Sequence, residues 1–234
     1  MAHSHPLDMA RQPAARSVAP VRAWLLAVAA VVFLMVSVGG ATRLTGSGLS
    51  ITEWRPIVGT VPPLSQADWQ EAFAKYKQIP QYERVNKGMS LDAFKRIYWW
   101  EWTHRFLGRL IGVAFLVPFL YFVAAGQIPR TLVPKLAGLF VLGGLQGAIG
   151  WYMVRSGLAD RIDVSQYRLA LHLGLAIAIL GALLWVALSL DAPKDRPRSK
   201  GSAHGWAAAL IAGLVFLQVE LGALVAGLPL AKRD

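Results

Sequence analysis

Residues 99–126 read WWEWTHRFLGRLIGVAFLVPFLYFVAAG, and this stretch decides the fold class. Its second part, residues 110–126, is an uncharged apolar run close to the roughly 20 residues that a helix needs to cross about 30 Å of hydrocarbon. Its first part places a glutamate, a histidine and two arginines at the mouth of that run. Ionisable groups are expensive there and usually mark a functional site. The stretch therefore predicts a membrane span with a site at its end.

Similar uncharged runs recur along the chain, at residues 23–41, 136–154, 169–190 and 205–219. The composition agrees, because 55% of the 234 residues are hydrophobic and only 16% are charged. In a typical soluble domain, about a quarter of the residues are charged. We therefore predict an all-α fold: a polytopic membrane helical bundle of about five transmembrane helices, the fifth being interrupted by Glu220.

The net charge of +11 is explained by membrane topology better than by nucleic acid, because no basic stripe alternates with aromatic residues. Lysine and arginine gather before the first run and in segments 127–135 and 191–204, which predicts that these segments are cytoplasmic. We expect a multi-pass protein of the cell inner membrane, with segment 43–103 outside. Cysteine is absent, which excludes disulfides, thiolate metal sites and cysteine nucleophiles.

The predicted organisation has four parts: a disordered cytoplasmic tail (1–22), a four-span half with the long external loop (23–190), a cytoplasmic loop (191–204), and a fifth span that starts an incomplete second half (205–230). Within the external loop, the pair Ser65 and Asp68 resembles a capping box and predicts a helix that Pro80 ends. A second helix is expected to start at Ser90 and to run into the span at 110–126.

On a helix, Glu101, His104 and Gly108 share one face. Gly108 is expected to leave a recess one turn from the imidazole. His172 lies in another predicted span at similar depth and has Ala176 four residues on. Two histidines at one depth on different helices are suited to bind haem iron from opposite sides.

Simpler interpretations remain open at this point. A histidine within a span often makes an ordinary polar contact, and Glu101 and Arg105 suit an i,i+4 ion pair. Zinc is disfavoured because a third ligand is not evident. Several arginines fall near the outer boundary, where they suit either interfacial anchoring or haem propionates. They are Arg43, Arg105, Arg109, Arg155 and Arg168.

Several long runs resemble the haem A synthase family, in the branch that lacks paired loop cysteines. The matching runs are VGGATRLTGSGLSITEWRPIVGTVPPL (38–64), YWWEWTHRFLGRLIG (98–112), GGLQGAIGWYMVRSGL (143–158), RLALHLGLA (168–176) and GALVAG (222–227). The likeness covers roughly residues 24–227.

The resemblance implies oxidation of a methyl group of haem O to a formyl group by successive hydroxylations, which gives haem A for cytochrome oxidase. It maps the iron ligands of the first half onto His104 and His172, and the family's motif glutamate onto Glu101. That carboxylate is expected to handle protons or to stabilise positive charge. Gly108, Arg105, Arg43 and Arg168 are the other candidate residues for haem binding.

One departure from the family concerns length. The family usually has eight spans, and its second half carries its own histidine pair and is expected to hold haem b. Here the chain is interpreted as truncated after the fifth span. Expected partners are haem O, haem A, membrane lipid, the haem O synthase, an electron acceptor or a second copy, but not nucleic acid. The alternative functions are a b-type cytochrome that carries electrons and an inactive remnant of the synthase.

Overall fold

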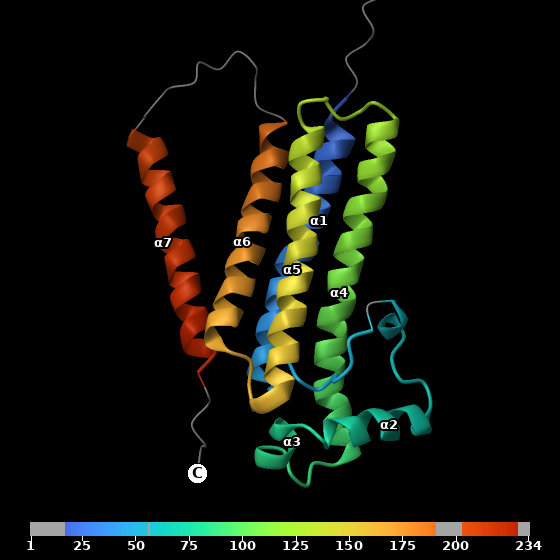
Figure 1. Ribbon diagram of the computed structural model, residues 1–234. Helices are drawn as coiled ribbons and strands as arrows, with labels where there is room; N and C mark the ends of the chain where they lie inside the picture. The colour runs from blue at the N-terminus through green and yellow to red at the C-terminus, as the bar shows by residue number, and fades with distance from the viewer. Residues whose placement is uncertain (1–16, 56, 191–202, 229–234) are drawn as a thin grey trace, which may run out of the picture.

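The computed structural model describes residues 17–55, 57–190 and 203–228. Five long helices in these ranges are long and apolar enough to cross a membrane, which confirms the predicted helical membrane bundle. They run in alternating directions along the chain (Figure 1). They are α1 (Ala19–Leu44), α4 (Leu91–Ala124), α5 (Val133–Asp160), α6 (Gln166–Ser189) and α7 (Ala203–Ala226).

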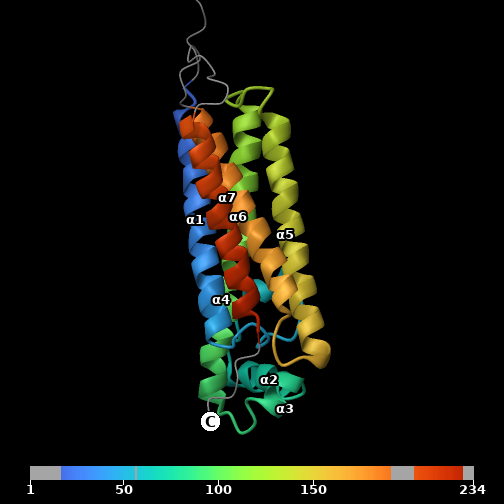
Figure 2. The same cartoon turned by 90° about the vertical axis from the view of Figure 1, so that its left-hand side faces the viewer.

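Four of these helices form a closed bundle. Helix α1 packs against α4 and α6, and α5 also packs against α4 and α6, so that α4 and α6 lie diagonally opposite each other. Helix α7 is attached outside this bundle and packs mainly on α6 (Figures 1 and 2). The first four spans thus enclose an interior that α7 does not enter.

The short elements gather at one end of the bundle, beside the start of α4 (Figure 1). The 3-10 helix η1 (Val58–Thr60) and α2 (Gln66–Tyr76) precede α3 (Pro80–Arg84). The predicted capping box is present, because the Ser65 side chain accepts from the Asp68 backbone N–H and the Asp68 carboxylate accepts from the Ser65 backbone N–H.

The predicted role of Pro80 was wrong. Helix α2 ends at Tyr76, and Pro80 instead begins α3, which the sequence interpretation did not include. Proline suits the first helical position because its missing N–H would have no partner there. The predicted start at Ser90 is confirmed, since its hydroxyl accepts from the Ala93 N–H at 3.2 Å.

Helix α4 has 34 residues, which corresponds to a length of about 51 Å. This is longer than the hydrocarbon layer of about 30 Å. The first turns of α4 therefore project beyond the other spans (Figure 1), and they pack against α2, whereas α3 packs against α5. Of the predicted parts, most of the tail 1–22 and of the loop 191–204 lies outside the described residues.

Buried apolar side chains form two separate clusters. The first joins α1, α4, α5 and α6 around residues such as Leu25, Phe119 and Leu183. The second joins α2 and the first turns of α4, around Tyr76 and Phe94. Between them lies a layer of the four-helix bundle, and this layer contains both candidate histidines, which belong to neither cluster.

Candidate functional site

His104 and His172 project from the two diagonal helices, α4 and α6. Each imidazole lies against a glycine of an intervening helix. A Cβ added to Gly39 of α1 would lie 3.0 Å from His104 Nε2, and one added to Gly150 of α5 would lie 2.9 Å from His172 Cε1. All four helices thus contribute to one layer around the two histidines.

The glycines beside the imidazoles differ from the one singled out in the sequence. A Cβ added to Gly108 would meet only the Met35 Cε atom, at 3.4 Å, and would not contact His104. Sequence spacing identifies neighbours on the same helix, whereas Gly39 and Gly150 come from other helices. Both glycines lie within the runs that resemble the family, which is the signal that could have identified them. The haem-binding role of Gly108 stays a prediction.

Glu101 is only 2% exposed, and four hydrogen bonds hold its carboxylate. Oε2 accepts from the Ser50 hydroxyl and the Ile51 backbone N–H, both at 2.8 Å. Oε1 accepts from Arg105 Nε at 3.0 Å and from another nitrogen of the same guanidinium at 2.6 Å. The carboxylate therefore connects α4 to the loop that follows α1, one turn from His104.

Arg105 completes this connection from the other side. Its guanidinium donates to the carbonyl oxygens of Ile51 at 2.9 Å and of Glu53 at 3.0 Å, in addition to Glu101. The expected i,i+4 ion pair is therefore present and has further partners. The Arg105 side chain is only 11% exposed, so this ion pair is partly buried and is not a surface anchor.

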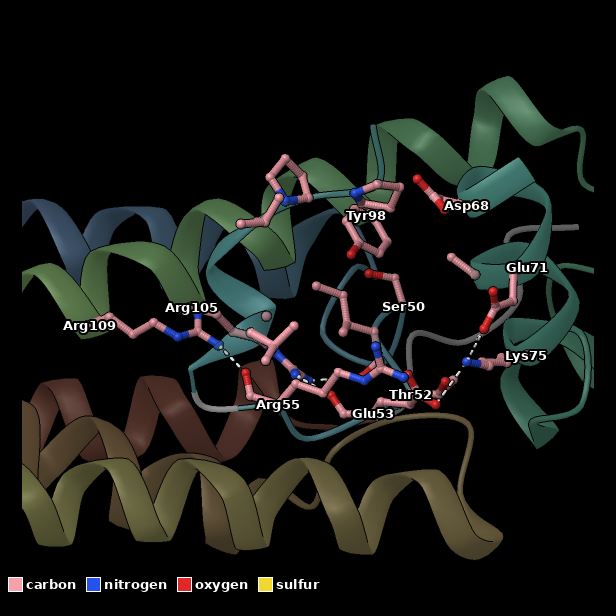
Figure 3. A pocket seen from close by; sticks show the side chains of 17 residues that line it. Ser50, Thr52, Glu53, Arg55, Asp68, Glu71, Lys75, Tyr98, Arg105 and Arg109 are labelled. Carbon is pink, nitrogen blue, oxygen red and sulfur yellow. Dashed lines mark hydrogen bonds and ion pairs between the residues drawn. The ribbon is translucent and has the colours of Figure 1, made fainter. Parts of the chain in front are cut away.

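A pocket of about 270 Å³ lies on the outer side of this loop. Figure 3 shows Arg105 and Arg109 reaching it from α4 and Lys75 from α2, with Glu53 and Arg55 from the loop between them. Neither His104 nor His172 lines it. Charged side chains thus line part of the pocket, and one of them belongs to Arg105, the residue next to His104 in α4.

Ion pairs shape the charge at the outer edge of this pocket. Lys75 donates to Glu53 at 2.9 Å and to Glu71 at 2.6 Å. These hydrogen bonds raise the pKa of Lys75 above its ordinary value, and the bond from Lys75 lowers the pKa of Glu71. Both shifts favour the charged forms of Lys75 and Glu71 at neutral pH.

The remaining candidate arginines have protein partners at the same end of the bundle. Arg43 forms an ion pair with Asp163 at 3.1 Å and donates to the Leu228 carbonyl, which connects α1 to the α5–α6 loop and to α7. Arg168 donates to the Ser156 hydroxyl and the Tyr152 hydroxyl of α5. Binding of haem propionates by Arg43, Arg105 or Arg168 stays a prediction.

The chemistry of the layer fits a haem group. Two imidazoles lie on opposite helices, and glycine takes the place of a larger side chain beside each. In addition, His172 Nδ1 is a buried atom without a hydrogen-bond partner among the described residues. Polar groups inside a membrane bundle normally have partners, so an unpartnered atom on this imidazole favours a functional role for His172 over an ordinary polar contact.

The comparisons with known proteins agree with this geometry. A family model described as a cytochrome oxidase assembly protein, COX15-CtaA, matches residues 22–232. The heme A synthase of Parvibaculum lavamentivorans is 63% identical over 205 residues, which are 88% of this chain and 59% of that protein. The heme A synthase of Azorhizobium caulinodans is 60% identical over 215 residues, which are 92% and 61% of the two chains.

The chain thus spans about three fifths of the length of the curated relatives that it matches. No solved structure matches it. The family match covers nearly all of the described residues, including both histidines and Glu101. With five membrane helices and a histidine layer inside the matched region, this chain belongs to the COX15-CtaA family of cytochrome oxidase assembly proteins.

Proposed function

We propose that this chain carries the haem-modifying site of a haem A synthase, which oxidises a methyl group of haem O to a formyl group by successive hydroxylations. The observation that carries the proposal is that His104 and His172 project from diagonally opposite helices of the bundle, each imidazole against a glycine. The relatives named heme A synthase support the reaction.

In this proposal, haem O would bind in the histidine layer as the substrate. His104 and His172 hold the iron from α4 and α6. Gly39 and Gly150 leave room for the two imidazoles, because a Cβ at either position would crowd the ring. Met35, which lies beside Gly108, borders the layer on the α1 side.

Glu101 has two tasks in the proposal. Its contacts to Ser50, Ile51 and Arg105 fix the loop after α1 against α4. Its negative charge, one turn from His104, stabilises positive charge that develops during methyl oxidation, or takes up the protons released. Each hydroxylation adds an oxygen atom taken from water and releases two electrons and two protons, so the enzyme requires an electron acceptor as a partner.

The remaining parts of the proposal concern the surroundings of the site. We place the protein in the cell inner membrane, with the N-terminus in the cytoplasm and segment 43–103 outside, in accord with the positive-inside rule. Haem O would come from the haem O synthase, and haem A would pass to cytochrome oxidase. The haem b expected for the family would bind outside the four-helix bundle described above.

The test is to express this chain in a host that makes haem O, purify it, and identify the extracted pigment. Bound haem O, a hydroxylated derivative or haem A supports the enzyme. Haem b that is not modified supports instead an electron-carrying b-type cytochrome. His104→Ala and His172→Ala should each remove most haem absorbance, whereas His204→Ala should not, because His204 is exposed at the start of α7. Full haem content in either site variant contradicts the proposed ligand pair.

A further inference from the structure

Gln146 is a polar side chain that the proposed reaction does not use. It lies on α5 four residues before Gly150, on the inward-facing side of the helix. Residues 141–145 and 147–148 around it are exposed, whereas Gln146 is partly buried. An amide inside a membrane bundle is costly unless its groups are satisfied. Its contacts therefore need an explanation.

The orientation of this amide is fixed by a backbone group. Gln146 Nε2 lies 2.9 Å from the His172 carbonyl oxygen. A carbonyl oxygen only accepts hydrogen bonds, so the amide nitrogen and not the amide oxygen must face it. The same nitrogen lies 3.4 Å from His172 Nε2.

This orientation determines which nitrogen of the imidazole carries the proton. An amide nitrogen donates hydrogen bonds and does not accept them. His172 Nε2 must therefore present its lone pair to Gln146, which leaves the ring proton on Nδ1. Nδ1 is the ring nitrogen that has no partner among the described residues, and Gln146 Oε1 is likewise buried without a partner there. The two side chains thus hold one unused donor and one unused acceptor.

We propose that Gln146 is a positioning residue for His172: it keeps the imidazole proton on Nδ1 and so reserves the Nε2 lone pair for haem iron. This inference rests on the proposed function. Metal-bound histidines usually donate their other ring N–H to a nearby acceptor, and loss of that partner weakens metal binding by about 10–100-fold. Gln146 Oε1 is an unused acceptor on the residue that already contacts this histidine.

The long contact to Nε2 agrees with this role. A distance of 3.4 Å exceeds the usual 2.7–3.2 Å of an N–H donor, so this hydrogen bond is weak. Its replacement by a bond to iron therefore costs little. The shorter bond, from Gln146 of α5 to the His172 carbonyl oxygen of α6, does not involve the ring and keeps the Gln146 side chain beside His172.

The first experiment needs no haem. The full chain, with ¹⁵N-labelled histidine, is purified in detergent micelles, and the ring signals of His172 are assigned with the variant His172→Ala. We expect the proton on Nδ1 in the unaltered chain. In Gln146→Met, which has a similar shape but no donor, the proton should redistribute to Nε2. A matched control is Gln218→Met, because Gln218 is exposed on α7.

The second experiment titrates the same proteins with ferric protohaem and follows absorbance. Gln146→Met should bind about 10–100-fold more weakly than the unaltered chain. Gln218→Met should bind equally well. His172→Ala should lose the low-spin spectrum of a haem with two histidine ligands.

The outcomes separate the two proposals. A proton on Nε2 in the unaltered chain overturns the role of Gln146, even if no variant folds. So does unchanged haem affinity in Gln146→Met when His172→Ala has lost haem, and the ligand pair then stands. A spectrum that does not change in His172→Ala overturns both the ligand pair and the positioning role.

Discussion

The substitution Glu101→Gln tests the best-defined contacts of the site. Glutamine has almost the shape of glutamate, but it has only one acceptor oxygen and a donor in place of the other. It can accept from Ser50 and Ile51, or from Arg105, but not from both sides. Its NH2 group would face donors on the side that loses the oxygen.

The size of the effect follows from burial. Removal of one partner from a buried ion pair costs about 3–5 kcal/mol. We expect the lower end, about 3 kcal/mol, because Arg105 is 11% exposed and keeps its bonds to the Ile51 and Glu53 carbonyls. Since about 1.4 kcal/mol is a factor of ten, the state in which the loop is detached from α4 should become roughly a hundredfold more populated.

Hydrogen exchange measures this directly, because the Ile51 amide donates to Glu101 Oε2. Its protection should fall roughly a hundredfold in Glu101→Gln. The matched control is Glu53→Gln, whose partners Arg55 and Lys75 form surface ion pairs that contribute about 0–1 kcal/mol. Equal protection of Ile51 in Glu101→Gln and the unaltered chain would refute the connecting role.

The same variant separates the connecting role from the chemical role. Haem should still bind, and the product should shift from haem A toward haem O or a hydroxylated intermediate. A group of this kind typically contributes 10²–10⁴-fold to the rate. Normal haem A formation despite a detached loop would leave Glu101 with its connecting role alone.

Three further predictions concern other parts of the chain. Gly39→Val should place side-chain atoms against Nε2 of His104 and abolish most haem absorbance, whereas Gly40→Val, with open space around it, should leave absorbance unchanged. The Ser65 backbone N–H lowers the pKa of Asp68 below its ordinary value of 3.8. The stabilisation that the Asp68 carboxylate gives to α2 is therefore complete above about pH 4 and is lost as the pH falls through the lowered pKa. Amide exchange in α2 as a function of pH measures this loss, and protection that rises on acidification would contradict it. Glu220→Met should stabilise the contact of α7 with α6 by about 1–3 kcal/mol, measured by unfolding in detergent. The reason is that Glu220 Oε1 is buried without a partner in the described chain. A loss of stability would show that the carboxyl group has a partner.

Sequence patterns were sufficient for the membrane helices because the signal is local. A long uncharged run must form a helix in lipid, since backbone groups have no other partners there. The starts at Ser65 and Ser90 were equally predictable, because a cap involves residues three positions apart. The role of Pro80 was not predictable, because a proline can either end a helix or begin one. The conformation of the residues before it decides between these two roles.

The site was predictable only in part, for a related reason. His104, His172 and Glu101 stand out because ionisable side chains near a span are rare. Which atoms they contact depends on the order of the helices around the bundle, which periodicity does not report. Gly39 and Gly150 therefore appeared in the sequence as two glycines among many, and Gln146 as one polar residue in an apolar run.

The layer between the two apolar clusters gives a physical reason for the position of the site. Protein cores are close-packed, so insertion of a large flat group into either cluster would disrupt many contacts. The two histidines lie between these clusters along α4 and α6, and each imidazole lies against a glycine of a neighbouring helix. Next to this layer, Glu101 and Arg105 attach the loop after α1 to α4 by side-chain hydrogen bonds and not by close apolar packing. A planar ligand held between the two histidines, as proposed, would therefore leave both clusters intact, while the loop remains held within one helical turn of His104 on α4.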